Sequence, residues 1–423
     1  MTTEQKTALP LASPAKTRVS LVALDGYDDD ARVAKALADA LAPFGGMAGI
    51  VRPGDRVLLK ANLLAPAKPD EAVTSHPAIV RAVIREAKSA GASRVLVGDS
   101  PGVGTTRETM RACGILQVVE EEGAEMASFD HVAVFERLEN TLGKRLELTE
   151  HLLETDVLIT LPKLKTHVQM GYTGALKNQF GLVVGTRKAQ YHFRFQNRDR
   201  LADLMIDINR TAKVKLAILD AVVAMEGPGP HGGRPRKIGA LVVGTDLPAV
   251  DVVGCQLIGM DPQSYPLLQA AARAGYGTTE PADIEIVGER LEALRVPDFE
   301  LVKAPANIMR ILPLPGWMLR WLRRHIADRP RIDRSKCIRC LKCHNGCPVK
   351  PSAIDPRRQG DAVNHRTCIR CYCCHEFCPV NAIELRRSWV ERIFHLKAIG
   401  AAGSWLVGKF AGICQSLTKH DKT

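Results

Sequence analysis

Residues 337–348 read CIRCLKCHNGCP, and residues 368–379 read CIRCYCCHEFCP. Both stretches space their cysteines as C-x2-C-x2-C-x3-C and end in Cys-Pro. Three thiolates on one tight loop can bind three corners of a [4Fe–4S] cube, and in chains with two such runs the fourth ligand comes from the other run. The repeat therefore predicts two [4Fe–4S] clusters.

The exchange of the fourth ligand divides the eight cysteines into two sets. We assign Cys337, Cys340, Cys343 and Cys378 to cluster 1, and Cys368, Cys371, Cys374 and Cys347 to cluster 2. Such runs are typical of bacterial ferredoxins, so we expect a small C-terminal α+β module with that fold over residues 331–386. Cys373 is surplus to the count. We expect it to be a small buried residue beside cluster 2, with a redox role as the alternative.

Zinc sites and disulfide bonds are the alternatives for so many cysteines. Zinc sites favour paired C-x2-C knuckles with a longer gap between them, which two complete runs of four do not resemble. The chain begins without a signal-peptide pattern, so we expect a cytoplasmic protein without structural disulfides. Residues 1–17 are expected to form a disordered N-terminal tail.

Positive charge is concentrated in the C-terminal part of the chain. The net charge is +12, and residues 306–423 contain 22 Lys and Arg against 8 Asp and Glu. Cations near the clusters would offset their negative charge and raise their reduction potentials. A basic face could also bind an acidic electron donor protein, or an anionic membrane that holds a redox carrier. We expect no nucleic acid partner, because no nucleic-acid module is recognisable.

Two amphipathic stretches flank the cysteine module. Residues 305–330 form a linker that contains Trp317 and several arginines, and residues 387–423 form a tail that contains Trp389 among apolar and basic residues. Such segments either lie at a membrane interface or pack the module onto the rest of the chain. No run of 18 apolar residues is free of charges, so we expect peripheral membrane contact rather than a membrane-spanning helix.

Short β-branched runs alternate with helical patterns over residues 18–304. Bare apolar runs indicate strands that are buried on both faces of a parallel sheet. We therefore expect an α/β domain with a mainly parallel sheet and helices on both faces. The expected strands are Val19–Leu24, Arg56–Lys60, Arg94–Gly98, Val157–Leu161, Leu216–Leu219, Ala240–Gly244 and Ile284–Val287. The expected helices are Asp29–Leu41, Pro77–Ala90, Arg107–Glu122, Arg200–Thr211 and Pro248–Ile258, with a long loop over residues 178–197.

Polar or glycine-rich segments follow five of these strands. In parallel sheets ligands bind beyond the carboxyl ends of the strands, and glycines let backbone amides approach a ligand. A binding cleft is therefore expected at this edge of the sheet. Its candidate substrate-binding residues are Lys60, Asn62, His76, Asp99, Ser100, Glu226, His231 and Asp246.

The candidate catalytic residues come from two neighbouring segments. Lys163, Lys165 and His167 alternate along an extended stretch, so their side chains are expected to point the same way. With Lys177 and Asn178 they would bind a small anionic substrate, and His167 would supply protons. A solvated basic edge is the alternative. No nucleotide-binding or hydrolase motif is present, so a nicotinamide or flavin site is not supported.

Several motifs resemble the family called domain of unknown function 362. The similarity runs from about Val19 to about Glu289, and with the cysteine module the chain resembles the ferredoxin-bearing members of that family. The resemblance implies one domain that recurs beside a ferredoxin module, and it implies no particular activity. The motifs are KANLL (60–64), TSHP (74–77), GDSPG (98–102), LPKLKTH (161–167), GALKN (174–178), MEGPGP (225–230) and DLPAVD (246–251).

These features predict an iron–sulfur protein, with a reductase as the leading hypothesis. The clusters would accept electrons from a donor and pass them to an anionic substrate or cofactor in the cleft. Tethering a donor beside its acceptor raises their effective concentration. One alternative is a non-catalytic electron carrier or assembly factor. Another is a maturation protein that binds a metal or tetrapyrrole through histidines such as His76, His167, His192 and His231.

Overall fold

The computed structural model describes residues 15–136, 142–185, 187–302 and 327–386. Residues 1–14 of the expected N-terminal tail lie outside the described residues. The same holds for most of the amphipathic linker and for the whole tail 387–423.

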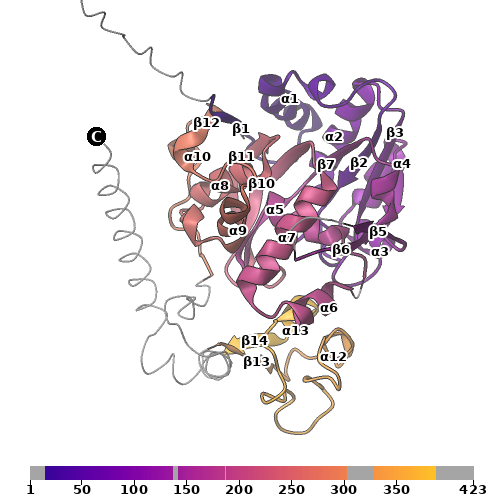
Figure 1. The fold of residues 1–423 in the computed structure, drawn as a ribbon, viewed down its shortest axis with the longest axis vertical. Helices are drawn as coiled ribbons and strands as arrows, with labels where there is room; N and C mark the ends of the chain where they lie inside the picture. The colour runs from indigo at the N-terminus through magenta and orange to yellow at the C-terminus, as the bar shows by residue number, and fades with distance from the viewer. Residues whose placement is uncertain (1–14, 137–141, 186, 303–326, 387–423) are drawn as a thin grey trace, which may run out of the picture.

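The α/β domain is built on one ten-stranded sheet (Figure 1). Eight strands follow the order β12-β1-β11-β10-β7-β2-β3-β4, while β8 pairs with β10 and β9. The pairs β10–β7, β7–β2, β2–β3, β3–β4 and β1–β12 are parallel, and β11 is antiparallel to both of its neighbours. The prediction of a mainly parallel sheet is confirmed. The strands are β1 (Thr17–Ala23), β2 (Arg56–Lys60), β3 (Arg94–Asp99), β4 (Glu125–Ser128), β7 (Val157–Thr160), β8 (Lys163–His167), β9 (Gly171–Thr173), β10 (Leu216–Glu226), β11 (Arg234–Gly244) and β12 (Ile284–Gly288), with a separate hairpin of β5 (Val132–Glu136) and β6 (Arg145–Thr149).

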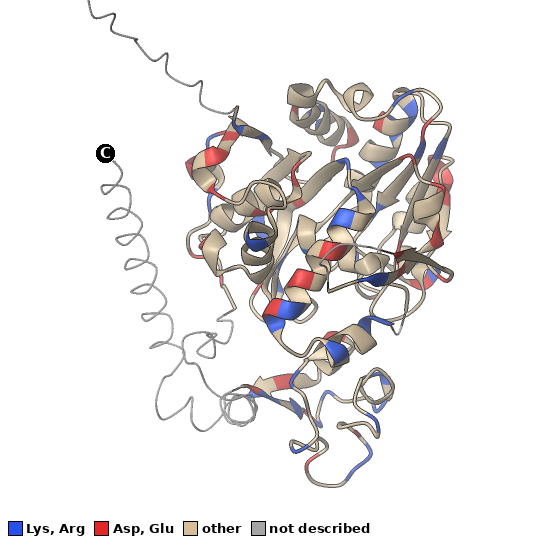
Figure 2. Cartoon of the chain, viewed as in Figure 1, with Lys and Arg blue, Asp and Glu red and all other residues tan. Residues whose placement is uncertain are grey.

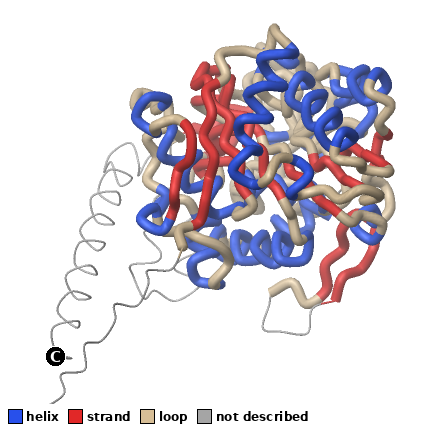
Figure 3. The backbone as a smooth tube through the Cα atoms, turned by 90° about the horizontal axis from the view of Figure 1, so that it is seen from above, coloured by secondary structure: helices blue, strands red, loops and turns tan. Residues whose placement is uncertain are grey.

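Helices cover both faces of the sheet (Figure 3). Side chains alternate between the faces of a strand, so Val57 and Leu59 of β2 join one apolar core while Leu58 joins the other. The first core includes residues of α1, α2 and α4, and the second includes residues of α7, α8 and α9. The helices are α1 (Asp30–Leu41), α2 (Pro77–Ser89), α3 (Thr106–Ala112), α4 (Ile115–Glu121), α5 (Ala175–Asn178), α6 (Arg187–Arg194), α7 (Arg198–Ala212), α8 (Leu247–Leu257), α9 (Pro266–Ala274) and α10 (Leu291–Leu294).

Two sequence-based expectations about local structure are wrong. The single helix expected over residues 107–122 is two helices, because Gly114 adopts a φ of 77° between α3 and α4. The long loop expected over residues 178–197 contains the 3-10 turn Gln179–Leu182 and helix α6. β10 and β11 are also longer than expected, at 11 residues each, because they continue as a hairpin.

The C-terminal module has the expected small α+β fold. β13 (Arg329–Ile332) pairs antiparallel with β14 (Ile383–Arg386), and two short helices, α12 (Lys342–Asn345) and α13 (Cys373–Glu376), carry cysteines. In Figure 1 the module lies below the α/β domain, with α13 nearer to that domain than α12.

The two cysteine loops share an unusual backbone conformation. Arg339 and Leu341 in the first run have φ angles of 54° and 62°, and Arg370 and Tyr372 at the matching positions of the second have 60° and 61°. Residues with side chains rarely adopt this left-handed region. Each such residue turns the chain between two cysteines, so that the thiols can converge on one centre.

Candidate functional site

A buried ion pair connects the tips of β2 and β3. Lys60 Nζ lies 2.8 Å from Asp99 Oδ1 and donates a 2.8 Å hydrogen bond to the Ala61 carbonyl. Asp99 Oδ2 accepts a 2.8 Å hydrogen bond from the backbone N–H of Leu63. Burial lowers the pKa of Lys60, and the carboxylate of Asp99 opposes that shift. Because the two charges offset each other, this pair organises the cleft and contributes no free charge to it.

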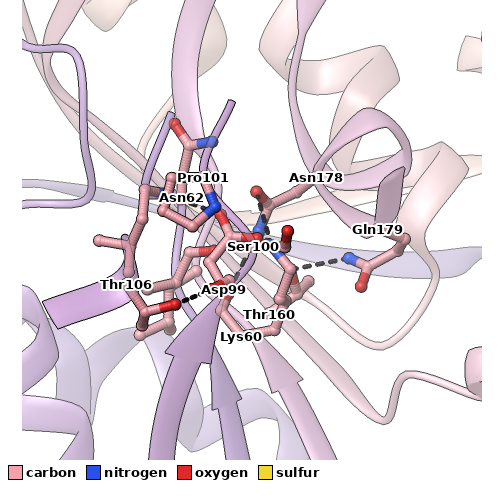
Figure 4. A network of polar contacts seen from close by, with 12 residues as sticks. Lys60, Asn62, Asp99, Ser100, Pro101, Thr106, Thr160, Asn178 and Gln179 are labelled. Atoms are coloured by element: carbon pink, nitrogen blue, oxygen red, sulfur yellow. Dashed lines mark hydrogen bonds and ion pairs between the residues drawn. The ribbon is translucent and has the colours of Figure 1, made fainter. Parts of the chain in front are cut away.

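The segment after β9 is held against this ion pair (Figure 4). Asn178 donates from Nδ2 to the Lys60 carbonyl (3.2 Å) and to Thr160 Oγ1 (2.8 Å), and Gln179 Nε2 donates to the same hydroxyl oxygen (2.7 Å). Gly181 follows at a point where an added Cβ would overlap Asp99 Oδ1. Only glycine therefore lets the chain pass so close to the pair.

Lys163 belongs to a different buried cluster. Its Nζ lies 2.8 Å from Asp220 Oδ2 and donates a 2.7 Å hydrogen bond to the hydroxyl of Tyr27. The Tyr27 ring stacks on the ring of His76 at 3.6 Å, and burial lowers the pKa of His76 to about 4. Although Lys163 and Lys165 share a strand, these contacts direct the Lys163 ammonium group away from the cleft cavity.

Lys165 and Lys177 place two further ammonium groups in the cleft, where burial opposes their charged forms and the carboxylate of Glu376 favours them. Lys165 Nζ donates to Asn62 Oδ1 (2.6 Å) and to the Val73 carbonyl (2.7 Å), which are both neutral acceptors. Burial and the neighbouring ammonium group of Lys177 hold the pKa of Lys165 well below its usual range. Burial also lowers the pKa of Lys177. An anion in the cleft would stabilise the charged form of both side chains.

Asp251, which was not among the predicted site residues, positions Lys177. Its two carboxylate oxygens accept hydrogen bonds from the backbone N–H groups of Ala175 (2.6 Å) and Leu176 (2.9 Å), at the start of α5. Burial raises the pKa of Asp251 to about 7. The signal was present in the sequence, because Asp251 ends the motif DLPAVD, but only the fold places it beside α5.

His167 faces the C-terminal module. Its Nδ1 accepts hydrogen bonds from the backbone N–H groups of Gln169 (3.1 Å) and Met170 (3.2 Å), so the ring proton lies on Nε2. Nε2 lies 3.2 Å from Oε1 of Glu376 in α13. Burial lowers the pKa of His167 to about 4, so the imidazole is neutral near pH 7. This geometry suits a hydrogen-bond donor better than an imidazolium acid.

One cavity of about 80 Å³ lies where the two domains meet. The α/β domain contributes three lysines to its lining, and the module contributes the turn of α13. Lys188 donates from Nζ to the Ser100 carbonyl, and burial lowers its pKa to about 8. The lining includes six of the predicted site residues, Asn62, Asp99, Ser100, Lys165, Lys177 and Asn178, and also His192, a candidate ligand in the maturation-protein alternative. Lys188, Cys373, Glu376 and Phe377 also line it and were not predicted site residues.

The remaining predicted site residues have other contacts. Glu226 accepts a 3.0 Å hydrogen bond from the Glu300 backbone, and Asp246 caps α8 by accepting from Ala249 N at 2.9 Å. His231 Nδ1 lies 2.9 Å from Asn381 Oδ1 of the module, so it joins the two domains beside the cavity. In the described part of the chain, no three His, Cys, Asp or Glu side chains are arranged to hold a single metal ion.

Each predicted set of four cysteines surrounds a cavity of its own. Cys337, Cys340, Cys343 and Cys378 line one, and Cys347, Cys368, Cys371 and Cys374 line the other. Arg370, beside the second set, is 3% exposed, and its Nε and Nη2 have no partner among the described residues. Buried donors without acceptors are costly, and a negatively charged cluster would satisfy them. The donor sets and this guanidinium group therefore fit iron–sulfur clusters.

Comparisons with known proteins agree with this two-part organisation. Residues 57–256 match the model of a domain of unknown function (DUF362), and residues 329–379 match that of a 4Fe-4S dicluster domain. The chain is 34% identical over 274 residues to the thylakoid-associated protein sll1697 of Synechocystis, and the match covers 62% of this chain and 80% of the relative.

Two solved structures show a weak likeness to the fold. The lactate racemase apoprotein from Thermoanaerobacterium thermosaccharolyticum is 16% identical with a TM-score of 0.38, and the match covers 58% of this chain and 57% of that one. A protein from Thermotoga maritima is 14% identical with a TM-score of 0.32, over 50% of this chain and 55% of that one.

Neither domain provides a membrane-spanning segment within the described ranges, where no helix combines the necessary length and apolar character. The match to sll1697 spans four-fifths of that protein, and the two domain models match residues 57–256 and 329–379. The chain is an iron–sulfur protein that belongs to the DUF362 family and carries a ferredoxin-type 4Fe–4S domain at its C-terminal end.

Proposed function

We propose that the chain binds two [4Fe–4S] clusters through its two cysteine sets and works as a reductase. Such clusters accept and release one electron at a time. Cluster 2 would deliver electrons to a small anionic substrate or cofactor held in the cavity between the domains. The cytoplasmic location expected from the sequence remains part of this proposal.

The observation that carries the proposal is a wall shared by two cavities. Cys371 and Cys374 line the cavity of cluster 2, and Cys373 between them lines the cleft cavity. The same turn of α13 extends into the cleft with Glu376, which faces His167. A single turn of helix therefore separates a cluster site from the cationic pocket, which suits direct electron transfer.

The charges of the cavity support an anionic ligand. Its carboxylates within the described residues are Asp99, which pairs with Lys60, and Glu376. Three lysines line the same space, and the hydrogen bonds of Lys165 and Lys188 go to neutral oxygens. Buried charges are stable only when they are compensated, so an anion that enters between the domains would be bound strongly.

The test is to purify the protein without oxygen and identify any small anion that accompanies it. Lys177→Met should weaken binding of that anion by about tenfold to a hundredfold, because a charge-assisted hydrogen bond contributes about 1.5–3 kcal/mol. Lys35→Met, which removes an exposed lysine of α1, is the matched control.

A non-catalytic electron carrier would behave differently. Lys177→Met would then change only the reduction potential of cluster 2, because the lysine would act solely as a counter-charge to the cluster. Unchanged anion binding in Lys177→Met would refute the reductase proposal.

We further propose that the protein associates with a membrane surface. β13 pairs with β14, and Arg329 lies opposite Arg386, so the amphipathic linker ends and the amphipathic tail begins at one edge of the module. The relative from Synechocystis is described as thylakoid-associated. Sedimentation with vesicles that contain anionic lipid should decrease with added salt and on removal of residues 387–423. Salt-independent sedimentation or none at all would contradict this proposal.

A further inference from the structure

The loop of the first cysteine run is exposed to solvent, whereas the second run faces the α/β domain. Cys340, a predicted ligand of cluster 1, is exposed, and the neighbouring Ile338 side chain is 63% exposed. Ile338 and Arg339 both line the cavity that the cluster 1 cysteines surround. An electron would therefore cross only this short loop to pass between solvent and cluster 1.

Exposed cations flank this loop. Arg334 donates to the carbonyls of Pro356 and Arg358, which leaves its positive charge uncompensated. Arg339 and Lys342 are exposed, and neither has a carboxylate within ion-pair distance in the described ranges, although the charge of Lys342 acts on Glu108 of α3. Figure 2 shows Lys and Arg along the outer loops of the module. The loop therefore combines an exposed apolar side chain with a cationic rim.

We propose that this surface, the cluster 1 face (Arg334, Ile338, Arg339, Cys340 and Lys342), docks an acidic protein that donates one electron at a time. One electron leaves the reduced redox group of the donor and enters cluster 1, with no bond made or broken. The inference rests on the proposed electron-transfer function, but it does not depend on which substrate occupies the cleft.

The chemistry of the face favours a protein donor over a membrane. Electron-transfer partners form complexes with small interfaces and low affinity. Complementary charges guide the two proteins together, and a few apolar contacts stabilise the complex. A cationic rim around Ile338 fits that pattern. The two amphipathic segments, by contrast, join the module at β13 and β14, on a different part of it.

The experiment uses the full chain with its clusters and a reduced acidic [2Fe–2S] ferredoxin as the donor. The double variant Arg339→Glu with Lys342→Glu should slow cluster reduction roughly tenfold or more at low salt, and the difference should shrink as salt is added. The affinity for the oxidised ferredoxin, measured without electron transfer, should fall in parallel. Reduction by an uncharged small molecule should slow much less and independently of salt, because it reports only the lower cluster potential that the reversed charges cause. The matched control is Lys35→Glu with Arg290→Glu, the same charge change on exposed residues of the α/β domain.

Three results would overturn the inference. In the first, the charge-reversed and control proteins are reduced equally fast by the ferredoxin. In the second, the reversal abolishes binding to anionic vesicles and leaves the ferredoxin rate intact, which would assign the face to a membrane. In the third, the milder Arg339→Gln with Lys342→Gln, which removes both charges and keeps the side chains polar, has no effect on rate or affinity. Substrate binding in the cleft enters none of these measurements, so failure here is separate from failure of the proposed reductase.

Discussion

The two cysteine runs begin with the same four residues, Cys-Ile-Arg-Cys, but the first lies at the surface of the module and the second packs against the α/β domain. Arg339 of the first run is exposed, while Arg370 at the matching position of the second is 3% exposed. Lys342 is exposed, and its counterpart Cys373 is 1% exposed and lines the cleft. The local backbone is nearly identical, with left-handed residues at the same places. Two ligand loops that begin with the same residues thus lie in different surroundings, because different parts of the chain pack against them.

Under the proposed function, this difference would give electron transfer through the module a direction. The first run offers an exposed, cationic loop where a donor can approach cluster 1. Helix α13 of the second run packs against the α/β domain, and His375 Nε2 lies 3.3 Å from the Pro228 carbonyl. Electrons that enter at the first run would leave at the second, into the cavity that holds Lys165 and Lys177.

The largest expected effect comes from removing one ligand of each set. Cys340→Ala and Cys374→Ala should each reduce the iron content from about eight to about four per chain, because each removes one [4Fe–4S] cluster. Lys177→Met is then added to both proteins. It should lower the potential of the remaining cluster in the Cys340→Ala protein, since a nearby cation favours the reduced cluster. EPR-monitored redox titration measures this shift. A similar shift in the Cys374→Ala protein would show that the two clusters face the cleft equally.

The two matching arginines should differ in their effect on stability. Arg370→Met removes a buried guanidinium group whose Nη1 lies 2.9 Å from His365 Nδ1, so the free energy of unfolding should fall by about 2 kcal/mol. Arg339→Met changes an exposed side chain and should alter it by less than about 0.5 kcal/mol. Denaturant unfolding of the anaerobic protein, followed by the visible absorbance of the clusters, compares them. Equal losses would mean that the surroundings of the two runs do not differ as described.

The smallest expected effect is a difference in pH dependence between the two sides. Lys188 lines the cleft with a pKa lowered to about 8, so it is charged below that pH and loses its charge above it. Anion binding in the cleft should therefore weaken several-fold as the pH rises through 8. Docking at the cluster 1 face depends largely on guanidinium groups, which remain charged throughout. Both affinities are measured between pH 7 and 9. If donor docking weakens as much as anion binding over this range, the distinction is contradicted.

Much of the fold could be predicted from local patterns. The strands β1, β2, β3, β7 and β12 lie where apolar runs placed them, because strands buried on both faces leave a simple hydrophobic signal. The edge of the sheet that holds the cleft followed from the carboxyl ends of those strands. The sequence did not predict which of the polar segments at the strand ends line the same cavity. Lys163 and Lys165 alternate on one strand, yet Asp220 on β10 binds the first and leaves the second to the cleft.

The amino-acid sequence alone determined the cysteine sets and the α/β class, because ligand spacing and hydrophobic periodicity are properties of neighbouring residues. Only the tertiary structure decided that Glu376 meets His167 and that Cys373 closes the wall of a cationic cavity. Those contacts join residues from separate domains, and they depend on how the module packs against the α/β domain. No local pattern records that packing, so the identical Cys-Ile-Arg-Cys loops become distinguishable only once the chain is folded.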